Sequence, residues 1–143
     1  MSMEFVGHKT IALLDLWSLF HFLAGVAIGN LLFRLLPRRV NQDAVRESQY
    51  AQGYFALTTL LLLAYAWELL EYGLEQGLVG EGIAFWFQGQ EHWLNRLLAD
   101  PLLLLAGYLL SRRFPPVVWP ARLVILIWLW RFLFVLPHSM AYP

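Results

Sequence analysis

The sequence predicts an all-α integral membrane protein: one bundle of four transmembrane helices with a short interfacial segment between the second and third. Hydrophobic residues make up 59% of the 143 residues, and charged residues only 14%, whereas about 25% of the residues in soluble domains are charged. The mean hydropathy is +0.56. Four apolar stretches also reach the roughly 20 residues that a helix needs to cross a bilayer.

Prolines, glycines and charged residues separate the four stretches. The predicted helices cover about residues 11–36, 51–75, 92–111 and 117–136. Pro37 follows the first helix, Gly77 follows the second, and Pro115 with Pro116 interrupts the chain before the fourth, where a helix interior would not tolerate them. The segment from Ile83 to Phe87 is too short to span, so we expect it to lie in the interface.

Charge and cysteine content narrow the possible functions. Ten Lys and Arg residues balance ten Asp and Glu residues, so no net field attracts nucleic acid, and we expect no nucleic-acid partner. The absence of cysteine excludes disulfides, thiolate metal sites and a cysteine nucleophile. Histidines, carboxylates and hydroxyls remain for chemistry.

Basic residues predict the orientation. The two short loops at 34–46 and 112–122 hold seven arginines, and loops rich in Lys and Arg stay in the cytoplasm. Both chain termini are then extracytoplasmic, and we expect a multi-pass protein of the bacterial inner membrane.

Ionisable residues gather in the outer half of all four predicted helices, where burial in lipid is costly unless they face protein, water or a ligand. We predict that they form one polar intramembrane cluster. Its main members are His21, Glu68, Glu71, Asp100 and Arg131, and its secondary members are Asp15, Glu75, His92, Asn95 and Arg96. Arg131 is expected to pair with Glu68, Glu71 or Asp100.

Several uses of this cluster stay open at the level of sequence. The groups can simply pair with one another, or the set His21, Glu68, Glu71, His92 and Asp100 can hold a cation such as Zn, Fe or Mn. His21 beside Gly25 can also ligate a haem or a chlorophyll. Gly25 and Gly29 form a small-residue pair that allows close helix packing. No cofactor is assigned. Asp15, Ser18 and His21 have the residue types of a catalytic triad, but they share one helix, and Asp15 and His21 lie on different faces of it. No catalytic residue is therefore assigned either.

Three motifs together resemble a known group of proteins. They are Asp15-x5-His21-Phe22-x-x-Gly25, Trp67-Glu68-x-x-Glu71-Tyr72 and Gln88-Gly89-x-Glu91-x-Trp93-x-Asn95-x4-Asp100-x6-Gly107. This series is similar to the VanZ-like and YjdF-like families of small polytopic bacterial membrane proteins. The resemblance covers residues 15 to 107 and implies a polar site facing the outer leaflet; the name-giving branch is linked to resistance to a glycopeptide antibiotic.

The expected function is therefore that of a small inner-membrane binding module that acts on or with cell-envelope lipids, without demonstrated catalysis. One alternative is a structural accessory subunit that contacts other membrane-protein subunits in a larger respiratory or photosynthetic complex. Another is a metal-dependent membrane enzyme.

The orientation can be tested directly. Because the arginine-rich loops are predicted to be cytoplasmic, a reporter fused after Pro143 should behave as extracytoplasmic and one inserted at Asp43 as cytoplasmic. The reverse pattern of reporter activity would contradict the predicted topology.

Overall fold

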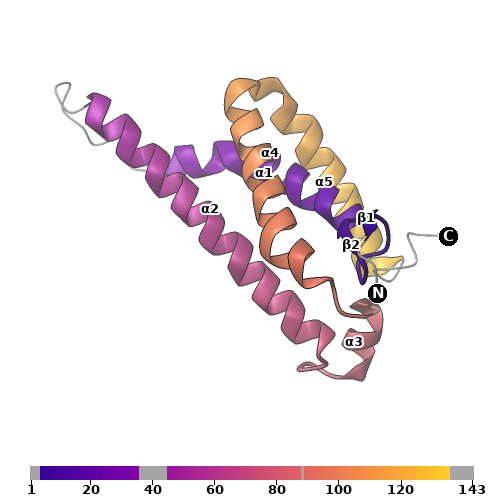
Figure 1. Cartoon of the computed structure of the whole chain (residues 1–143). Helices are drawn as coiled ribbons and strands as arrows, with labels where there is room; N and C mark the ends of the chain where they lie inside the picture. Colours follow the sequence, from indigo (N-terminus) through magenta and orange to yellow (C-terminus); the bar gives the residue numbers. More distant parts are fainter. Residues whose placement is uncertain (1–3, 36–44, 88, 136–143) are drawn as a thin grey trace.

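The computed structural model describes residues 4–35, 45–87 and 89–135 (Figure 1). Most of this part of the chain is helical, which confirms the all-α class. Its elements are β1 (Glu4–Val6), β2 (Ala12–Leu14), α1 (Leu16–Leu35), α2 (Val45–Glu75), α3 (Glu81–Phe87), the π-helix η2 (Asn95–Ala99), α4 (Asp100–Arg113), the 3₁₀ turn η3 (Pro115–Val117) and α5 (Val118–Phe134). The predicted loop with Arg38 and Arg39, and the end of the fourth predicted helix at residue 136, lie outside the described residues.

The N-terminal residues differ from the prediction. The first helix was expected from about residue 11, but Ala12–Leu14 pairs in parallel with Glu4–Val6 as a two-stranded sheet. The helix begins only at Leu16, because Asp15 caps it: the Ser18 backbone N–H donates to Asp15 Oδ1 at 2.8 Å, and the Asp15 N–H donates to Ser18 Oγ at 3.1 Å. Such a reciprocal pair satisfies N–H groups at and near the helix start and fixes its first residue.

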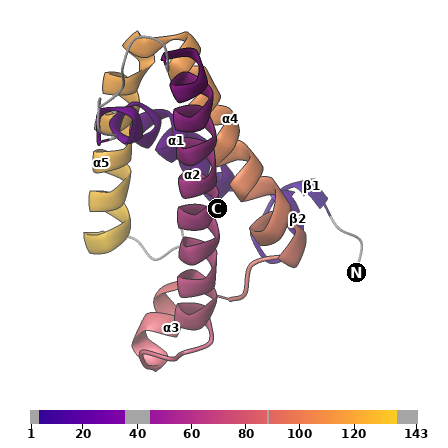
Figure 2. The same ribbon diagram turned by 90° about the vertical axis from the view of Figure 1, so that its left-hand side faces the viewer.

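The second helix and the short segment after it follow the prediction more closely. α2 ends at Glu75 as expected but begins at Val45, six residues before the predicted start at 51. Gly77 and Gly80 then adopt positive φ angles of 78° and 115°, which favour glycine and turn the chain. α3 follows as the expected short helix at the foot of α2 (Figure 2).

The third predicted helix is divided by a π-turn, and proline explains the division. Pro101 has no backbone N–H, so it cannot donate to the carbonyl of Leu97, four residues earlier. The hydroxyl of Tyr65 donates to that carbonyl instead, at 3.2 Å. The Asp100 N–H reaches back to the carbonyl of Asn95, five residues away, which places these two fully buried side chains one π-turn apart.

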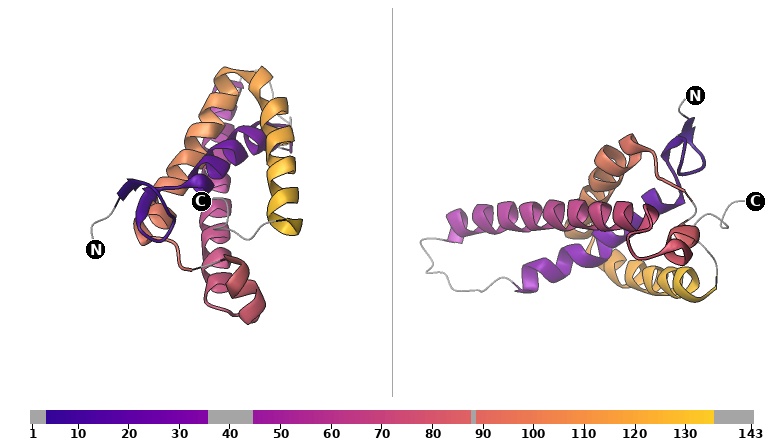
Figure 3. Two further views of the ribbon diagram at one scale, coloured as in Figure 1. Left: turned by 90° about the vertical axis from the view of Figure 1, so that its right-hand side faces the viewer. Right: turned by 90° about the horizontal axis from the view of Figure 1, so that it is seen from below.

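The helices are arranged around α1. α4 and α5 form a hairpin joined by η3, and α2 runs along the outside of the molecule (Figures 1 and 2). α1 crosses between these elements (Figure 3) and packs against both α4 and α5. Aromatic side chains join its beginning to α3 and α5, where the rings of Trp17 and Phe132 meet edge to face with centroids 4.7 Å apart.

Two glycines allow α1 and α4 to touch through their backbones. A Cβ atom on Gly25 would collide with the carbonyl oxygen of Leu104, and one on Gly107 would collide with the carbonyl oxygen of Phe22. Gly25 therefore packs helices together as predicted, with Gly107 as its counterpart. The environment of Gly29, the other predicted packing residue, lies outside the described residues.

Within residues 4–35, 45–87 and 89–135, two helices are long and apolar enough to cross a membrane, Gly53–Glu75 and Pro115–Phe134, and Leu16–Ile28 is a shorter apolar helix. Only 22% and 17% of the most apolar windows of the two longer helices is buried. Their apolar side chains therefore mostly face outward, unlike those of a core helix in a soluble protein.

The glycine contact generates a prediction. Gly107→Leu should lower the melting temperature in detergent strongly, because the added side chain must push apart two backbones. Gly82→Leu is the matched control, since nothing lies within 4 Å of a Cβ at Gly82. Equal melting temperatures for the two variants would show that the close approach of α1 and α4 does not matter for stability.

Candidate functional site

A cluster of buried polar residues lies where α1, α2, η2 and the start of α4 meet. Among the described residues it contains six buried acids and only two buried bases. The acids are Asp15, Glu68, Glu71, Glu75, Glu91 and Asp100, the bases are Lys9 and Arg96, and His21, Ser18 and Asn95 complete the set. We call this set the acidic cluster.

Both bases of the acidic cluster bind Glu75, at the end of α2. Lys9 Nζ lies 2.7 Å from Glu75 Oε1, and Arg96 Nη2 lies 2.6 Å from Glu75 Oε2. The same arginine reaches Glu91 at 3.4 Å and Glu68 at 3.7 Å. This network ties the loop between β1 and β2, α2 and η2 together, and Glu75 is its centre.

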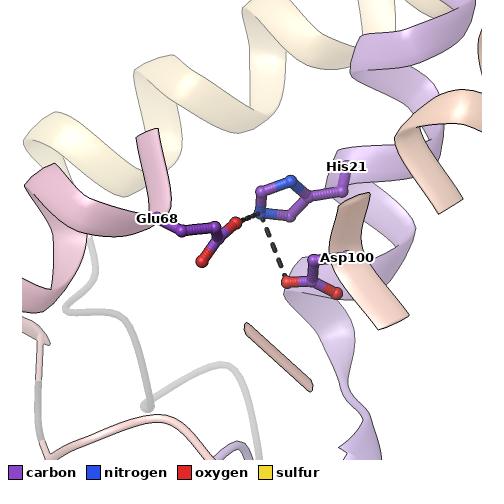
Figure 4. A group of neighbouring side chains, drawn as sticks. All are labelled: His21, Glu68 and Asp100. Atoms are coloured by element: carbon purple, nitrogen blue, oxygen red, sulfur yellow. Dashed lines mark ion pairs between the residues drawn. The ribbon is translucent and has the colours of Figure 1, made fainter. Parts of the chain in front are cut away.

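About two turns before Glu75 along α2, side chains from α1, α2 and α4 converge. Nε2 of His21 lies between two carboxylates, 3.4 Å from Glu68 Oε1 and 3.3 Å from Asp100 Oδ2 (Figure 4). The exposed fractions of the three side chains are 4%, 2% and 1%. His21 lies one turn before Gly25 on α1, and Asp100 lies one turn before Leu104 on α4. Because Gly25 packs against the backbone of Leu104, this contact sets the distance between His21 and Asp100. We call these three residues the deep triad.

The Glu68 carboxylate of the deep triad is incompletely satisfied. Neither oxygen of Glu68 accepts a hydrogen bond, although both are buried. Asp100 is buried beside Ser18 and Glu91, which are its hydrogen-bonding neighbours. Buried carboxylate oxygens are normally hydrogen-bonded or bound to a cation. Glu68 thus has hydrogen-bond acceptor capacity that no described donor fills.

The remaining acids have identifiable roles. Asp15 caps α1, and the Ser18 hydroxyl of the same cap also donates to Asn95 Oδ1 at 3.0 Å. Glu71 accepts a hydrogen bond from Trp67 Nε1 at 3.0 Å. Burial, together with the charges of Asp100 and Glu71, raises the pKa of Glu91. Ionising this carboxyl inside the cluster is therefore costly, and Glu91 keeps its proton unless positive charge is added.

Two predicted members lie elsewhere. Arg131 is exposed on α5 and forms no ion pair with the side chains that the structure describes, so its predicted pairing with Glu68, Glu71 or Asp100 is wrong. Arg96 occupies that role, because η2 turns it toward α2. His92 also stays outside the deep triad: its Nδ1 accepts from the Leu94 N–H at 3.3 Å.

Three residues of the cluster lie at the depth where the sequence predicts the polar layer but are not among the predicted site residues. Lys9 lies in the loop between the strands, Glu91 lies before η2, and Ser18 belongs to the helix cap. The Asp15-x-x-Ser18 spacing at the start of an apolar run is a capping pattern that could have identified Ser18. Nothing in the sequence pattern indicates that the Lys9 loop folds back onto α2.

Two groups in the described part of the chain have the geometry of a metal site. One is the deep triad, and the other is Asp15, Glu91 and Asp100; in each, one ligand atom per residue lies within 4.8 Å of the others. Asp100 is common to both groups. Of the five residues predicted to hold a cation, His21, Glu68 and Asp100 lie close enough to share one, whereas Glu71 and His92 are not part of either group.

Comparisons with protein-family models, with curated proteins and with solved structures find no match for this chain. The resemblance to the VanZ-like and YjdF-like families therefore rests on the three sequence motifs alone.

The correction at Arg131 leads to a prediction about stability. Glu75→Gln should destabilise the protein by about 3–5 kcal/mol, because it leaves two buried bases without their main partner. Arg131→Leu should change stability by less than about 0.5 kcal/mol, as expected for an exposed side chain without an ion pair. Denaturation in detergent, followed by circular dichroism, measures both; a larger loss in Arg131→Leu would restore the original pairing hypothesis.

Proposed function

We propose that this chain is a polytopic bacterial inner-membrane protein that acts as a binding module of the cell envelope, and that its acidic cluster receives a positively charged group. α1, α2, α4 and α5 are the proposed transmembrane helices, with both termini extracytoplasmic. The observation that carries the proposal is the imbalance of six buried acids against two buried bases.

The outward-facing apolar side chains support the membrane location. On α2, Leu62 is 67% exposed and Leu69 is 72% exposed, and on α5 Leu126 is 65% exposed. A water-soluble monomer rarely exposes such continuous apolar faces. Lipid or the apolar helices of another membrane protein would cover them.

The charge imbalance supports binding. Both bases are centred on Glu75, so they offset only part of the negative charge of the cluster. Burying an ionised carboxylate without a partner is expensive, and a chain selected only for folding has cheaper side chains for these positions. A bound cation supplies the missing charge.

Two sources can supply that cation: a metal ion, or the protonated amine of an envelope lipid headgroup. The second source agrees with the lipid association that the sequence resemblance implies. Both use the same chemistry, a positive charge among carboxylate oxygens.

The proposal is tested by native purification of the full chain in mild detergent, followed by mass spectrometry of retained lipids and co-purifying proteins and by elemental analysis of metals. We expect a cationic species in fixed stoichiometry with the wild-type chain. The double variant Glu68→Gln and Asp100→Asn should keep the helical circular dichroism spectrum but lose that species. Glu81→Gln, which changes an exposed glutamate at the start of α3, is the matched control and should retain it.

Three outcomes would contradict the proposal. If the wild-type chain carries no cationic species, the cluster is not a binding site. If the double variant retains every bound species, ligand binding does not involve these carboxylates. If large membrane subunits co-purify in fixed stoichiometry and no small cation does, the chain is a structural accessory subunit.

A further inference from the structure

We propose that His21, Glu68 and Asp100 form a binding site for one divalent transition-metal ion, and that zinc is the ion that fits it best. This inference rests on the proposed function, because it names the cation that the acidic cluster receives. It is carried by the geometry of the deep triad and by the unfilled acceptor capacity of Glu68.

The distances within the deep triad suit a shared metal better than direct hydrogen bonds. His21 Nε2 lies 3.4 Å from Glu68 Oε1 and 3.3 Å from Asp100 Oδ2, whereas a charge-assisted N–H to carboxylate bond is about 2.7–2.9 Å long. Ligand atoms that bind one tetrahedral zinc at 2.0–2.2 Å lie about 3.3–3.5 Å apart. The two distances from His21 therefore match the spacing of ligands around a common ion, and all three ligand atoms lie within 4.8 Å of one another.

The hydrogen-bond pattern independently indicates a ligand. The side chains of Glu68 and Asp100 are at most 2% exposed, and neither oxygen of Glu68 accepts a hydrogen bond. Both carboxylates point toward the imidazole of His21 (Figure 4). A protonated imidazole has one N–H at Nε2 and cannot satisfy both carboxylates along that direction, but a divalent ion can bind both and the ring nitrogen at once.

The donor set selects the class of metal. One imidazole nitrogen with two carboxylate oxygens is a mixed set that suits Zn²⁺ more than Mg²⁺ or Ca²⁺, which prefer oxygen ligands only. Three protein ligands leave a fourth tetrahedral position for water or for an oxygen atom of a substrate, as in catalytic rather than structural zinc sites.

The second group with ligand geometry is a weaker candidate. In the group of Asp15, Glu91 and Asp100, Asp15 already caps α1 through Ser18, and Glu91 already faces Arg96 at 3.4 Å. A cation placed there would have to compete with the guanidinium for Glu91, whereas Glu68 of the deep triad lies farther from that guanidinium, at 3.7 Å. We therefore assign the metal to the deep triad and expect one ion per chain.

The full chain, purified in detergent, stripped with a chelator and dialysed, is titrated with Zn²⁺ by calorimetry. In parallel it is titrated with Co²⁺, whose visible absorption distinguishes tetrahedral from octahedral coordination. We expect one equivalent of each metal to bind, a tetrahedral Co²⁺ spectrum, and a higher melting temperature with Zn²⁺ present.

The variants His21→Gln, Glu68→Gln and Asp100→Asn should each weaken zinc binding by at least about 100-fold, because each loses a direct ligand. Two matched controls should bind zinc like the wild type: Glu81→Gln for the carboxylates, and His8→Gln, whose ring nitrogen bonds to Thr10, for the histidine. Circular dichroism and size-exclusion chromatography verify that each variant is folded.

The possible outcomes separate this inference from the proposed function. If wild-type protein binds no zinc, or binds it equally well in the three triad variants, the metal site is wrong. The proposed function survives that result if an amine-bearing lipid is retained, and fails with it if no cation is. If the variants do not fold, the wild-type titration decides: one tetrahedral Co²⁺ per chain supports the site, and an octahedral spectrum or no binding overturns it.

Discussion

The close approach of α1 and α4 is the constraint on which the site depends. Gly25 and Gly107 let the two backbones touch, and a side chain at either position would separate the helices. One helical turn before this contact, His21 on α1 faces Asp100 on α4 at 3.3 Å. Without the two glycines, His21 and Asp100 would lie farther apart, and Glu68 on α2 could not complete the triad.

The acidic cluster consists of two parts with different physical roles. Around Glu75, both carboxylate oxygens receive a basic partner, so this part closes the fold by joining the N-terminal loop, α2 and η2. In the deep triad neither oxygen of Glu68 accepts a hydrogen bond, and an unsatisfied buried carboxylate costs free energy. The first part explains how the helices are held, and the second is the part in which we propose that a cation binds.

Sequence alone could predict the helices but not which of their faces meet. Apolar length and the positions of Pro115, Gly77 and Gly80 gave ranges close to the observed ones, because these signals are local. The predicted pairing of Arg131 with the acids rests on its position along the membrane normal, yet that position does not determine the direction in which a side chain points. Arg96 points into the cluster because Pro101 introduces a π-turn, and a π-turn changes the face on which residues before it lie.

The same distinction between local and long-range information applies to the site itself. His21, Glu68 and Asp100 could be identified because ionisable residues in apolar helices are rare and costly. Lys9 could not be identified as a site residue, because its contact with Glu75 joins a loop to a residue 66 positions later in the sequence. Lys9 changes the interpretation of the whole cluster. Because Lys9 and Arg96 both bind Glu75 most closely and Arg96 lies 3.7 Å from Glu68, these two buried bases offset only part of the negative charge of the cluster, and the cation that we propose would offset the rest.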